Sequence, residues 1–184
     1  MMLENKLGIT DSTELARMEE KISKQKALEM FESGFFETLE PGTYKSLALI
    51  HQYLFDEIYD FAGKLRKVNI SKGNFRFAPL MYLETALQSI DKMPQSTFDE
   101  IVEKYVEMNV AHPFRDGNGR VGRLIMFKEC LKYNIVPFII EDNLKMFYYR
   151  GLKEWNNEKG YLTDTCLTAQ DKYKAYLDYF RIAY

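Results

Sequence analysis

The residues best suited to chemistry lie together in one stretch, HPFRDGNGR, which runs from His112 to Arg120 and continues as VGR to Arg123. A histidine, an acid and two arginines surround a Gly-Asn-Gly sequence there, in a chain that has only two histidines. Such residues bury little apolar surface, and proline and glycine interrupt helices. We therefore expect a functional loop rather than a packing element.

The sequence of this loop predicts a site for a phosphate group. Helix-like segments lie on both sides of it, so Gly117-Asn118-Gly119 is expected to form a turn that leads into a helix. Free N–H groups and the positive end of the helix dipole attract anions there, and glycines let a phosphate approach the main chain. Arg120 and Arg123 would oppose the dipole of an empty site, but they suit a multiply charged anion.

Asp116 and His112 complete this set. Magnesium usually binds through one or two carboxylates plus phosphate oxygens, which makes Asp116 a candidate ligand. A histidine beside it can accept the proton of an attacking hydroxyl at neutral pH. The residues indicate transfer from a nucleotide phosphate to a hydroxyl, although each alone is a weak signal and either arginine could instead pair with Asp116. The sequence contains no Walker-type loop, the usual alternative for binding phosphates.

Helical periodicity predicts the elements that position this loop. We expect an N-terminal helix over about 12–34, with an apolar stripe formed by Leu15, Met18, Ile22, Leu28 and Phe31. Five further helices are expected, over 41–63, 95–111, 121–133, 143–158 and 163–182. The helix over 95–111 begins with a capping box of Thr97 and Glu100. The helix over 121–133 is apolar around most of its circumference, which predicts a central, buried position.

One segment, residues 67–79, breaks the helical pattern, and we name it the flap. Val68 and Ile70, a turn at Lys72-Gly73-Asn74, and then Phe75 and Phe77 alternate as in a small β-hairpin. A lone hairpin is only marginally stable, so it either packs against the helices or pairs with a strand-like partner. The fold is expected to be all-α with this hairpin added.

Composition narrows the class of protein. A chain of 184 residues that is 46% hydrophobic fits one globular domain, and a net charge of −2 gives no basic field for nucleic acid. Cys130 and Cys166 are too few and too distant for a disulfide framework or a zinc site, and Cys130 is expected in the core. No membrane-spanning run or secretory leader is present in the sequence, which favours a soluble cytoplasmic protein that binds neither nucleic acid nor membranes.

From His112 to Arg123 the chain resembles the signature of Fic-domain proteins, His-Pro-Phe-x-Asp/Glu-Gly-Asn-Gly-Arg-x-x-Arg, at every specified position. Three other stretches, HQYLFDEIYDFAGKLR, KGNFRFAP and FYYRGLKEWNNEKG, resemble the family's helix-and-turn, its flap and the segment that closes its adenine pocket. The resemblance runs from about Leu15 to Asp178. It implies one Fic domain over residues 1–184, a compact helical fold with a hairpin flap and a motif loop at 112–123.

The resemblance also implies an activity, protein adenylyltransferase: AMP would pass from ATP to a Ser, Thr or Tyr hydroxyl of a target protein or of the enzyme itself. His112 would be the general base and Asp116 the magnesium ligand. Asn118 would lie near the α-phosphate and both arginines near the outer phosphates. The implied nucleotide-binding residues are Gly117, Asn118, Gly119, Arg120 and Arg123, with Tyr149 and Asn156, seven apart in a later helix, at the adenine. A target strand would dock along the flap edge, Ile70, Ser71, Lys72, Gly73, Asn74, Phe75, Arg76 and Phe77.

Several alternatives stay open. Phosphocholine transfer and removal of AMP occur on the same scaffold, whereas the Doc-like relatives that phosphorylate carry a lysine where this chain has Gly119. A regulator that binds ATP without turnover is the alternative from another class. Near the motif, Phe114 is expected to anchor the loop in the core, and His51 is expected to be structural.

Many Fic proteins are inhibited by a glutamate in the signature Ser/Thr-x-x-x-Glu followed by Gly or Asn, which pairs with the second arginine, here Arg123. No stretch of this chain completes the signature, and Ser33 to Glu37 is the best partial match. Ser33 and Glu37 are thus the candidate inhibitory residues, although Gly34 weakens such a helix. We favour an enzyme that is active alone, or one restrained by a separate antitoxin protein that supplies the glutamate.

Overall fold

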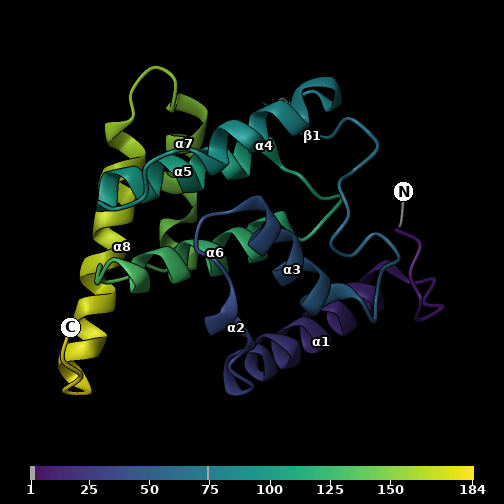
Figure 1. Ribbon diagram of the computed structural model, residues 1–184, viewed down its shortest axis with the longest axis horizontal. Coiled ribbons are helices and arrows are strands. Elements are labelled where there is room, and N and C mark those ends of the chain that lie inside the picture. The colour runs from purple at the N-terminus through teal and green to yellow at the C-terminus, as the bar shows by residue number, and fades with distance from the viewer. Residues whose placement is uncertain (1–2, 74) are drawn as a thin grey trace.

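A helix formed directly after the motif loop, α6 (Asn118–Lys132), lies at the centre of the fold. The structure is a computed structural model that describes residues 3–73 and 75–184. Figure 1 shows α6 crossing the middle of the molecule, with α5 (Phe98–Ala111) above it and α3 (Tyr44–Phe55) and α1 (Ser12–Glu32) below. Helices α5 and α3 contact α6 directly, and α1 packs on α3.

The remaining helices complete the shell around this centre. Helix α8 (Gly160–Tyr179) packs against α7 (Lys145–Glu154) and α5 at the end of the molecule where the C-terminus lies (Figure 1). Helix α4 (Leu83–Asp91) lies on α5 and α3, and α2 (Phe35–Thr38) is a single turn after α1. Two 3-10 turns, η1 (Leu80–Tyr82) and η2 (Asp142–Leu144), precede α4 and α7.

The only strands in the described part of the chain are β1 (Ser71–Lys72) and β2 (Phe75–Arg76). They are antiparallel, with Ser71 opposite Arg76 and Lys72 opposite Phe75. The predicted all-α fold with one small hairpin is therefore confirmed. The ladder of paired residues is shorter than the predicted flap, residues 67–79. Asn74, part of the expected turn and docking edge, lies outside the described residues.

The core consists of two apolar clusters that meet at α6. One lies between α1, α3, α4 and the motif loop and includes Phe114, Val121 and Ile125. The other lies between α5, α6, α7 and α8 and includes Met126 and Cys130. Because two different sides of α6 face the two clusters, this helix is buried around most of its circumference, as its sequence predicts. Cys130 and Cys166 are both free thiols in the core, and burial raises the pKa of each to about 12.

The predicted apolar stripe of α1 is only partly correct. Leu15 is buried, but Leu28 and Phe31 are 59% and 40% exposed. The buried face instead includes Glu19 and Ser23. Polar side chains can replace apolar ones on a buried face when they are hydrogen-bonded, and both of these have partners in the motif loop.

Helix ends agree with the sequence where a capping residue marks them. Thr97 and Glu100 form the predicted capping box of α5. Helix α1 begins after Asp11, whose side chain accepts from the Glu14 N–H. The helix predicted over 41–63 ends at Phe55, and turns follow it. In the described residues, no helix has both the length and the apolar character that crossing a membrane requires.

Candidate active site

The motif loop connects the end of α5 to the start of α6, and left-handed residues bound it on both sides. His112 caps α5 with φ 49°, and Gly117 caps the start of α6 with φ 75°. A left-handed conformation costs a non-glycine residue free energy and persists only where the surroundings impose it. His112 is therefore held in this conformation by its neighbours.

Phe114 and Asn118 close the loop onto itself. The Asn118 side chain accepts from the Phe114 N–H and donates to the Phe114 carbonyl, each at 2.8 Å. The Phe114 ring is fully buried, which confirms the predicted anchor. Each polar atom of the Asn118 side chain thus has one partner within the loop.

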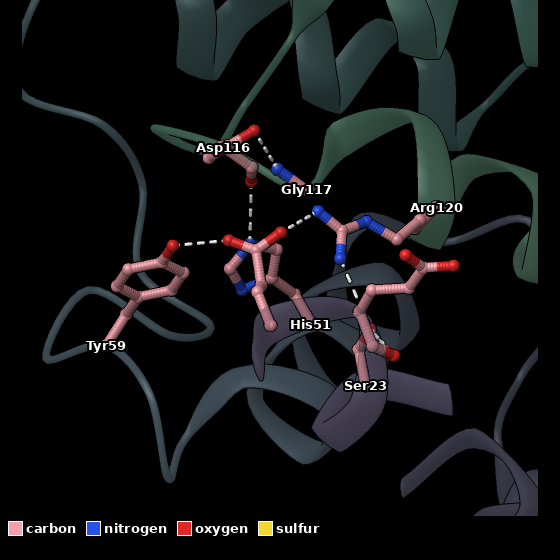
Figure 2. A network of polar contacts seen from close by, with 8 residues as sticks. Ser23, His51, Tyr59, Asp116, Gly117 and Arg120 are labelled. Carbon is pink, nitrogen blue, oxygen red and sulfur yellow. Dashed lines mark hydrogen bonds and ion pairs between the residues drawn. The ribbon is translucent and has the colours of Figure 1, made fainter. Parts of the chain in front are cut away.

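His51 supports the loop from α3 and has a defined tautomer. Its Nδ1 accepts from the Gly63 N–H at 2.9 Å, so the ring proton lies on Nε2, which donates to the Asp116 carbonyl at 2.9 Å. The predicted structural role is confirmed, since the ring is completely buried and packs on Phe114 with centroids 4.0 Å apart. Burial lowers the pKa of His51 to about 4 and keeps the ring neutral. Figure 2 shows this contact with Asp116.

The start of α6 presents unpaired donors. The N–H groups of Asn118 and Gly119 have no acceptor among the described residues, whereas those of Arg120 and Val121 donate to Gly117. Free N–H groups at a helix start, together with its dipole, form an anion site. Gly117 is needed there, because a Cβ on it would lie 2.6 Å from the Phe55 ring.

Arg120, predicted as a ligand of the outer phosphates, points toward α1 in this structure. Its guanidinium donates to Ser23 Oγ at 3.2 Å (Figure 2). It also forms an ion pair with Glu19 and lies over the Phe55 ring. Glu19 also accepts from the Tyr59 hydroxyl. The sequence suggested Asp116 as an acidic partner for this arginine, but the carboxylate that binds it comes from α1.

Arg123 is the motif arginine that remains available. Its side chain is exposed on α6 and has no ion pair or hydrogen bond within residues 3–73 and 75–184. Its Nη1 lies 3.4 Å from the position that a Cβ of Gly119 would occupy. It therefore lies near the free N–H groups and can add a full positive charge to the anion site.

Asp116 is exposed at the mouth of the loop. Its Oδ1 accepts from the Gly117 N–H at 2.7 Å, and the other carboxylate oxygen has no partner in the described structure (Figure 2). No group of three or more His, Cys, Asp or Glu that could hold a metal ion occurs among the described residues. One accessible carboxylate beside an anion site fits magnesium, which takes much of its coordination from phosphate oxygens and water.

The imidazole of His112 is oriented from two sides. Its Nδ1 lies 3.2 Å from the Asn109 carbonyl, which assigns the ring proton to Nδ1 and leaves the Nε2 lone pair free. Phe77 stacks on the ring, with centroids 3.6 Å apart and planes 14° from parallel. The pKa of His112 is lowered to about 4, mainly by burial and in smaller part by the Arg66 and Lys72 charges, whereas the Asn109 hydrogen bond and the Asp116 charge oppose the shift. The ring is neutral at pH 7 and can accept a proton at Nε2.

Arg66, which the sequence did not suggest, joins the flap to the motif loop. Its side chain is 4% exposed and donates only to backbone carbonyls, those of His112 and Val68 at 2.7 Å each, Ala111 at 3.3 Å, and Ala78. Burial lowers its pKa, yet a guanidinium stays charged at neutral pH. Arg66 therefore fixes both ends of the flap and the residue that caps α5.

The remaining predicted nucleotide residues lie near α7. Tyr149 is 55% exposed on that helix, and the Lys72 ammonium lies 5.7 Å from its ring centroid, so the flap reaches across to α7. Asn156 was predicted in the same helix, but α7 ends at Glu154 and Asn156 is exposed in the following turn. The chain turns there because α8 packs closely on α7, with a Cβ on Gly151 only 2.8 Å from Leu162.

The predicted docking edge and the candidate inhibitory residues have clear positions. The described flap residues from Ser71 to Arg76 are exposed, and each strand has one partner only. Ser33 ends α1, and Glu37 lies in α2 beside Lys128, whose ammonium is 3.4 Å from the Glu37 carbonyl. Among the described residues, no ion pair joins Glu37 to Arg123.

Three residues important for this geometry, Glu19, Tyr59 and Arg66, were missed from the sequence. Leu15, Glu19 and Ser23 follow one another at intervals of four and so lie on one face of α1. Polar residues on the same face as a buried leucine were the signal from which Glu19 could have been predicted. A second apolar row, through Met18 and Ile22, concealed it. Arg66 gives no such signal, because its partners are backbone carbonyls.

These features define a small helical domain with an anion-binding helix start and a neutral histidine beside it. The chain belongs to the Fic/DOC family, whose model matches residues 41–130. It is 31% identical over 130 residues to the protein adenylyltransferase VbhT of Bartonella schoenbuchensis, an alignment that covers 65% of this chain and 27% of that protein. It is 30% identical over 138 residues to the probable protein adenylyltransferase Fic of Salmonella typhimurium, covering 67% of this chain and 64% of that protein. The chain thus spans only part of both relatives.

A solved structure shares the fold. BepC, an effector protein of Bartonella tribocorum crystallised with bound AMPPNP, superposes with a TM-score of 0.70 over 92% of each chain, at 19% sequence identity. At that identity the similarity establishes the overall fold alone.

Proposed function

We propose that this protein is a protein adenylyltransferase, which transfers AMP from ATP to a Ser, Thr or Tyr hydroxyl of a target protein. The observation that supports it best is the neutral imidazole of His112, fixed through Nδ1 with Nε2 free. In the same loop, the start of α6 and Arg123 provide an anion site. Both named relatives are described as protein adenylyltransferases, one of them as a probable one.

The proposed reaction forms one bond and breaks one. The target hydroxyl oxygen attacks the α-phosphorus of ATP, the bond from that phosphorus to the oxygen bridging the β-phosphate breaks, and pyrophosphate leaves. His112 Nε2 accepts the hydroxyl proton. A pKa of about 4 makes the ring a weak base in the empty site, but the negative phosphates of bound ATP raise the pKa of a nearby histidine.

Magnesium is proposed with the nucleotide, and Asp116 is the residue that would bind it, through its unpaired carboxylate oxygen. When bound, the ion would neutralise phosphate charge. The free N–H groups of Asn118 and Gly119 would bind the phosphate nearest the loop, and Arg123 an outer one. We assign Arg120 to holding α6 on α1, since Glu19 and Ser23 already bind it.

The wider proposal concerns the partners and the extent of the domain. A target segment would add to the exposed flap edge as a strand, and the adenine would lie near Tyr149 and Asn156. The Fic domain would extend over residues 1–184, because α1 and α8 pack onto the helices that surround the motif. A cytoplasmic location suits an enzyme that consumes ATP, and a separate inhibitory protein is the proposed form of restraint.

Two isotope labels test this proposal. The protein is incubated with magnesium and a lysate of a candidate host cell, with ATP labelled first at the α- and then at the γ-phosphate. We expect protein bands labelled by α-label alone, and mass spectrometry of the bands should detect AMP on a Ser, Thr or Tyr. His112→Ala should remove the label while ATP binding persists, because removing a general base costs ~10²–10⁴-fold.

Other outcomes would identify a different activity. Label from the γ-phosphate alone would indicate phosphorylation. Binding of ATP without any labelled protein or released pyrophosphate would indicate a regulator that senses ATP. Either result would contradict adenylyl transfer.

A further inference from the structure

Phe77 of the flap lies face to face with the histidine of the motif loop. The ring centroids of Phe77 and His112 are 3.6 Å apart and the planes differ by 14°, the closest and most nearly parallel aromatic pair in the described structure. The Phe75 ring meets Phe77 edge-on at 5.1 Å on the same strand side. A row of aromatic rings therefore leads from the exposed hairpin to the imidazole.

The backbone fixes where this phenyl ring lies. The Phe77 N–H donates to the Ile70 carbonyl at 3.2 Å, which ties the residue to the hairpin. The next residue, Ala78, donates to the Val110 carbonyl of α5 at 3.0 Å, and its own carbonyl accepts from Arg66. The backbone of Phe77 is thus held on both sides, and its ring contacts both Phe75 and His112.

The imidazole has few other restraints. One hydrogen bond, from Nδ1 to the Asn109 carbonyl at 3.2 Å, fixes one ring atom but still permits the ring to tilt about that bond. The charged groups that act on the ring from the neighbouring elements are Arg66, Lys72 and Asp116, and none of them forms a hydrogen bond with it in the described structure. A flat contact on one face is what removes the remaining freedom.

We propose that Phe77 is a positioning residue for His112: its ring fixes the tilt of the imidazole, so that Nε2 points to the place where the acceptor hydroxyl arrives. The inference rests on the proposed function for its catalytic consequence, but the contact itself can be tested without catalysis. It also links two parts of the site, because the hairpin that would bind the target is the element that orients the base.

The test uses Phe77→Leu, which removes the flat ring and keeps an apolar side chain, with Phe77→Tyr as the conservative variant and Phe75→Leu as the matched control on the same hairpin. The chain has only two histidines, so NMR resonances of the two imidazoles are readily assigned. We expect Phe77→Leu to admit water to His112 and raise its pKa from about 4 toward the ordinary value, while His51 is unchanged. Phe77→Tyr and Phe75→Leu should leave both titrations near those of the wild type.

Kinetics supply the second measurement. Phe77→Leu should lower kcat on the order of tenfold with little change in KM for ATP, because misorienting a base costs less than removing it and the phosphate ligands are untouched. Phe77→Tyr should restore kcat. If Phe77→Leu leaves both kcat and the His112 titration near those of the wild type, the proposal is wrong.

One measurement on the wild-type protein covers the case in which Phe77→Leu does not fold. A phenyl ring stacked at this distance shifts the carbon-bound protons of the His112 imidazole upfield by its ring current. Ordinary chemical shifts for those protons would refute the stacking contact. The wild type could instead show this upfield shift, and Phe77→Leu the change in His112 titration, while the wild type transfers no AMP. That result would contradict the proposed function, and the positioning contact would stand.

Discussion

Arg120, in the first turn of α6, forms an ion pair with Glu19, which precedes it by 101 residues and lies on the buried face of α1. Tyr59 donates to the same carboxylate. The pKa of the Tyr59 phenol is raised mainly by burial, and the hydrogen bond and negative charge of Glu19 raise it further. The first arginine of the motif is therefore a structural link between α1 and α6, whereas the Arg123 side chain has no such partner among the described residues.

Breaking this link should destabilise the fold. Arg120→Ala leaves Glu19, whose side chain is 10% exposed, without its positive partner, and we expect a loss of about 3 kcal/mol in the free energy of unfolding. Urea denaturation measures it. Lys24→Ala is the control, because its ion pair with Glu20 is exposed on the same helix and should contribute ~1 kcal/mol at most. Equal losses for the two variants would mean that the Glu19 contact contributes no more than a surface pair.

Arg123 should control affinity for the outer phosphates. We expect Arg123→Ala to weaken binding of ATP by about tenfold or more and to affect AMP much less, because a desolvated charge-assisted contact contributes about 1.5–3 kcal/mol. Calorimetry with both nucleotides measures the difference. Lys132→Ala, at the exposed far end of α6, is the control for a lost positive charge. Equal losses for ATP and AMP would place Arg123 away from the outer phosphates.

Gly117 should tolerate no side chain. Its φ of 75° is strained for other residues, and a Cβ would also lie 2.6 Å from Phe55 and 3.3 Å from His51. We expect Gly117→Ala to cost more than 2 kcal/mol and to abolish ATP binding. Gly34→Ala separates the two causes, because Gly34 has a φ of 74° and nothing within 4 Å of the added Cβ. A Gly117→Ala protein as stable as Gly34→Ala would show that the loop can move away from α3.

His51 should make stability depend on pH. Its pKa is about 4 in the folded protein and about 6.5 in an unfolded chain, so the unfolded state binds more protons between these values. The stabilisation from neutral His51 is complete above pH 6.5 and is lost as the pH falls toward 4. We expect the gap in unfolding free energy between the wild type and His51→Gln to shrink by about 2 kcal/mol from pH 7 to 4.5, with divalent ions absent. Subtracting the two unfolding free energies at each pH removes the contributions of other titrating groups, which both proteins share. Glu129 is one of them, and burial raises its pKa to about 8. A gap that does not vary with pH would contradict a buried neutral ring.

Inhibition by Glu37 is the weakest of the sequence-based hypotheses. Glu37 lies beside Lys128, a buried lysine whose ammonium donates to the Phe36 carbonyl. Burial lowers the pKa of Lys128, and the negative charge of Glu37 opposes that shift in part. We expect Glu37→Gly and Glu37→Gln to leave self-modification with ATP unchanged. A rise of several-fold in both variants would restore Glu37 as an internal inhibitor, and a rise in Glu37→Gly alone would point to the backbone of α2.

Local signals in the sequence account for what could be predicted. The Thr97 capping box, the apolar circumference of α6 and the Gly-Asn-Gly turn are each encoded within a few neighbouring residues. The partner of Arg120 could not be found in this way, because the choice between Asp116 and Glu19 depends on how α1 packs against α3. The hydrogen bonds of the Asn118 side chain to the Phe114 backbone could not be predicted either, because they depend on how the loop folds back on itself.

The anchoring of the flap has a consequence for how such a protein can diverge. Arg66 binds the carbonyls of Val68 and Ala78, and every amino acid offers a carbonyl at these positions. The side chains from Ile70 to Arg76 can therefore be exchanged without removing any acceptor of Arg66 or changing the cap of α5. The side chains of the hairpin tip can therefore change while the Arg66 contacts and the backbone geometry of the motif loop stay the same.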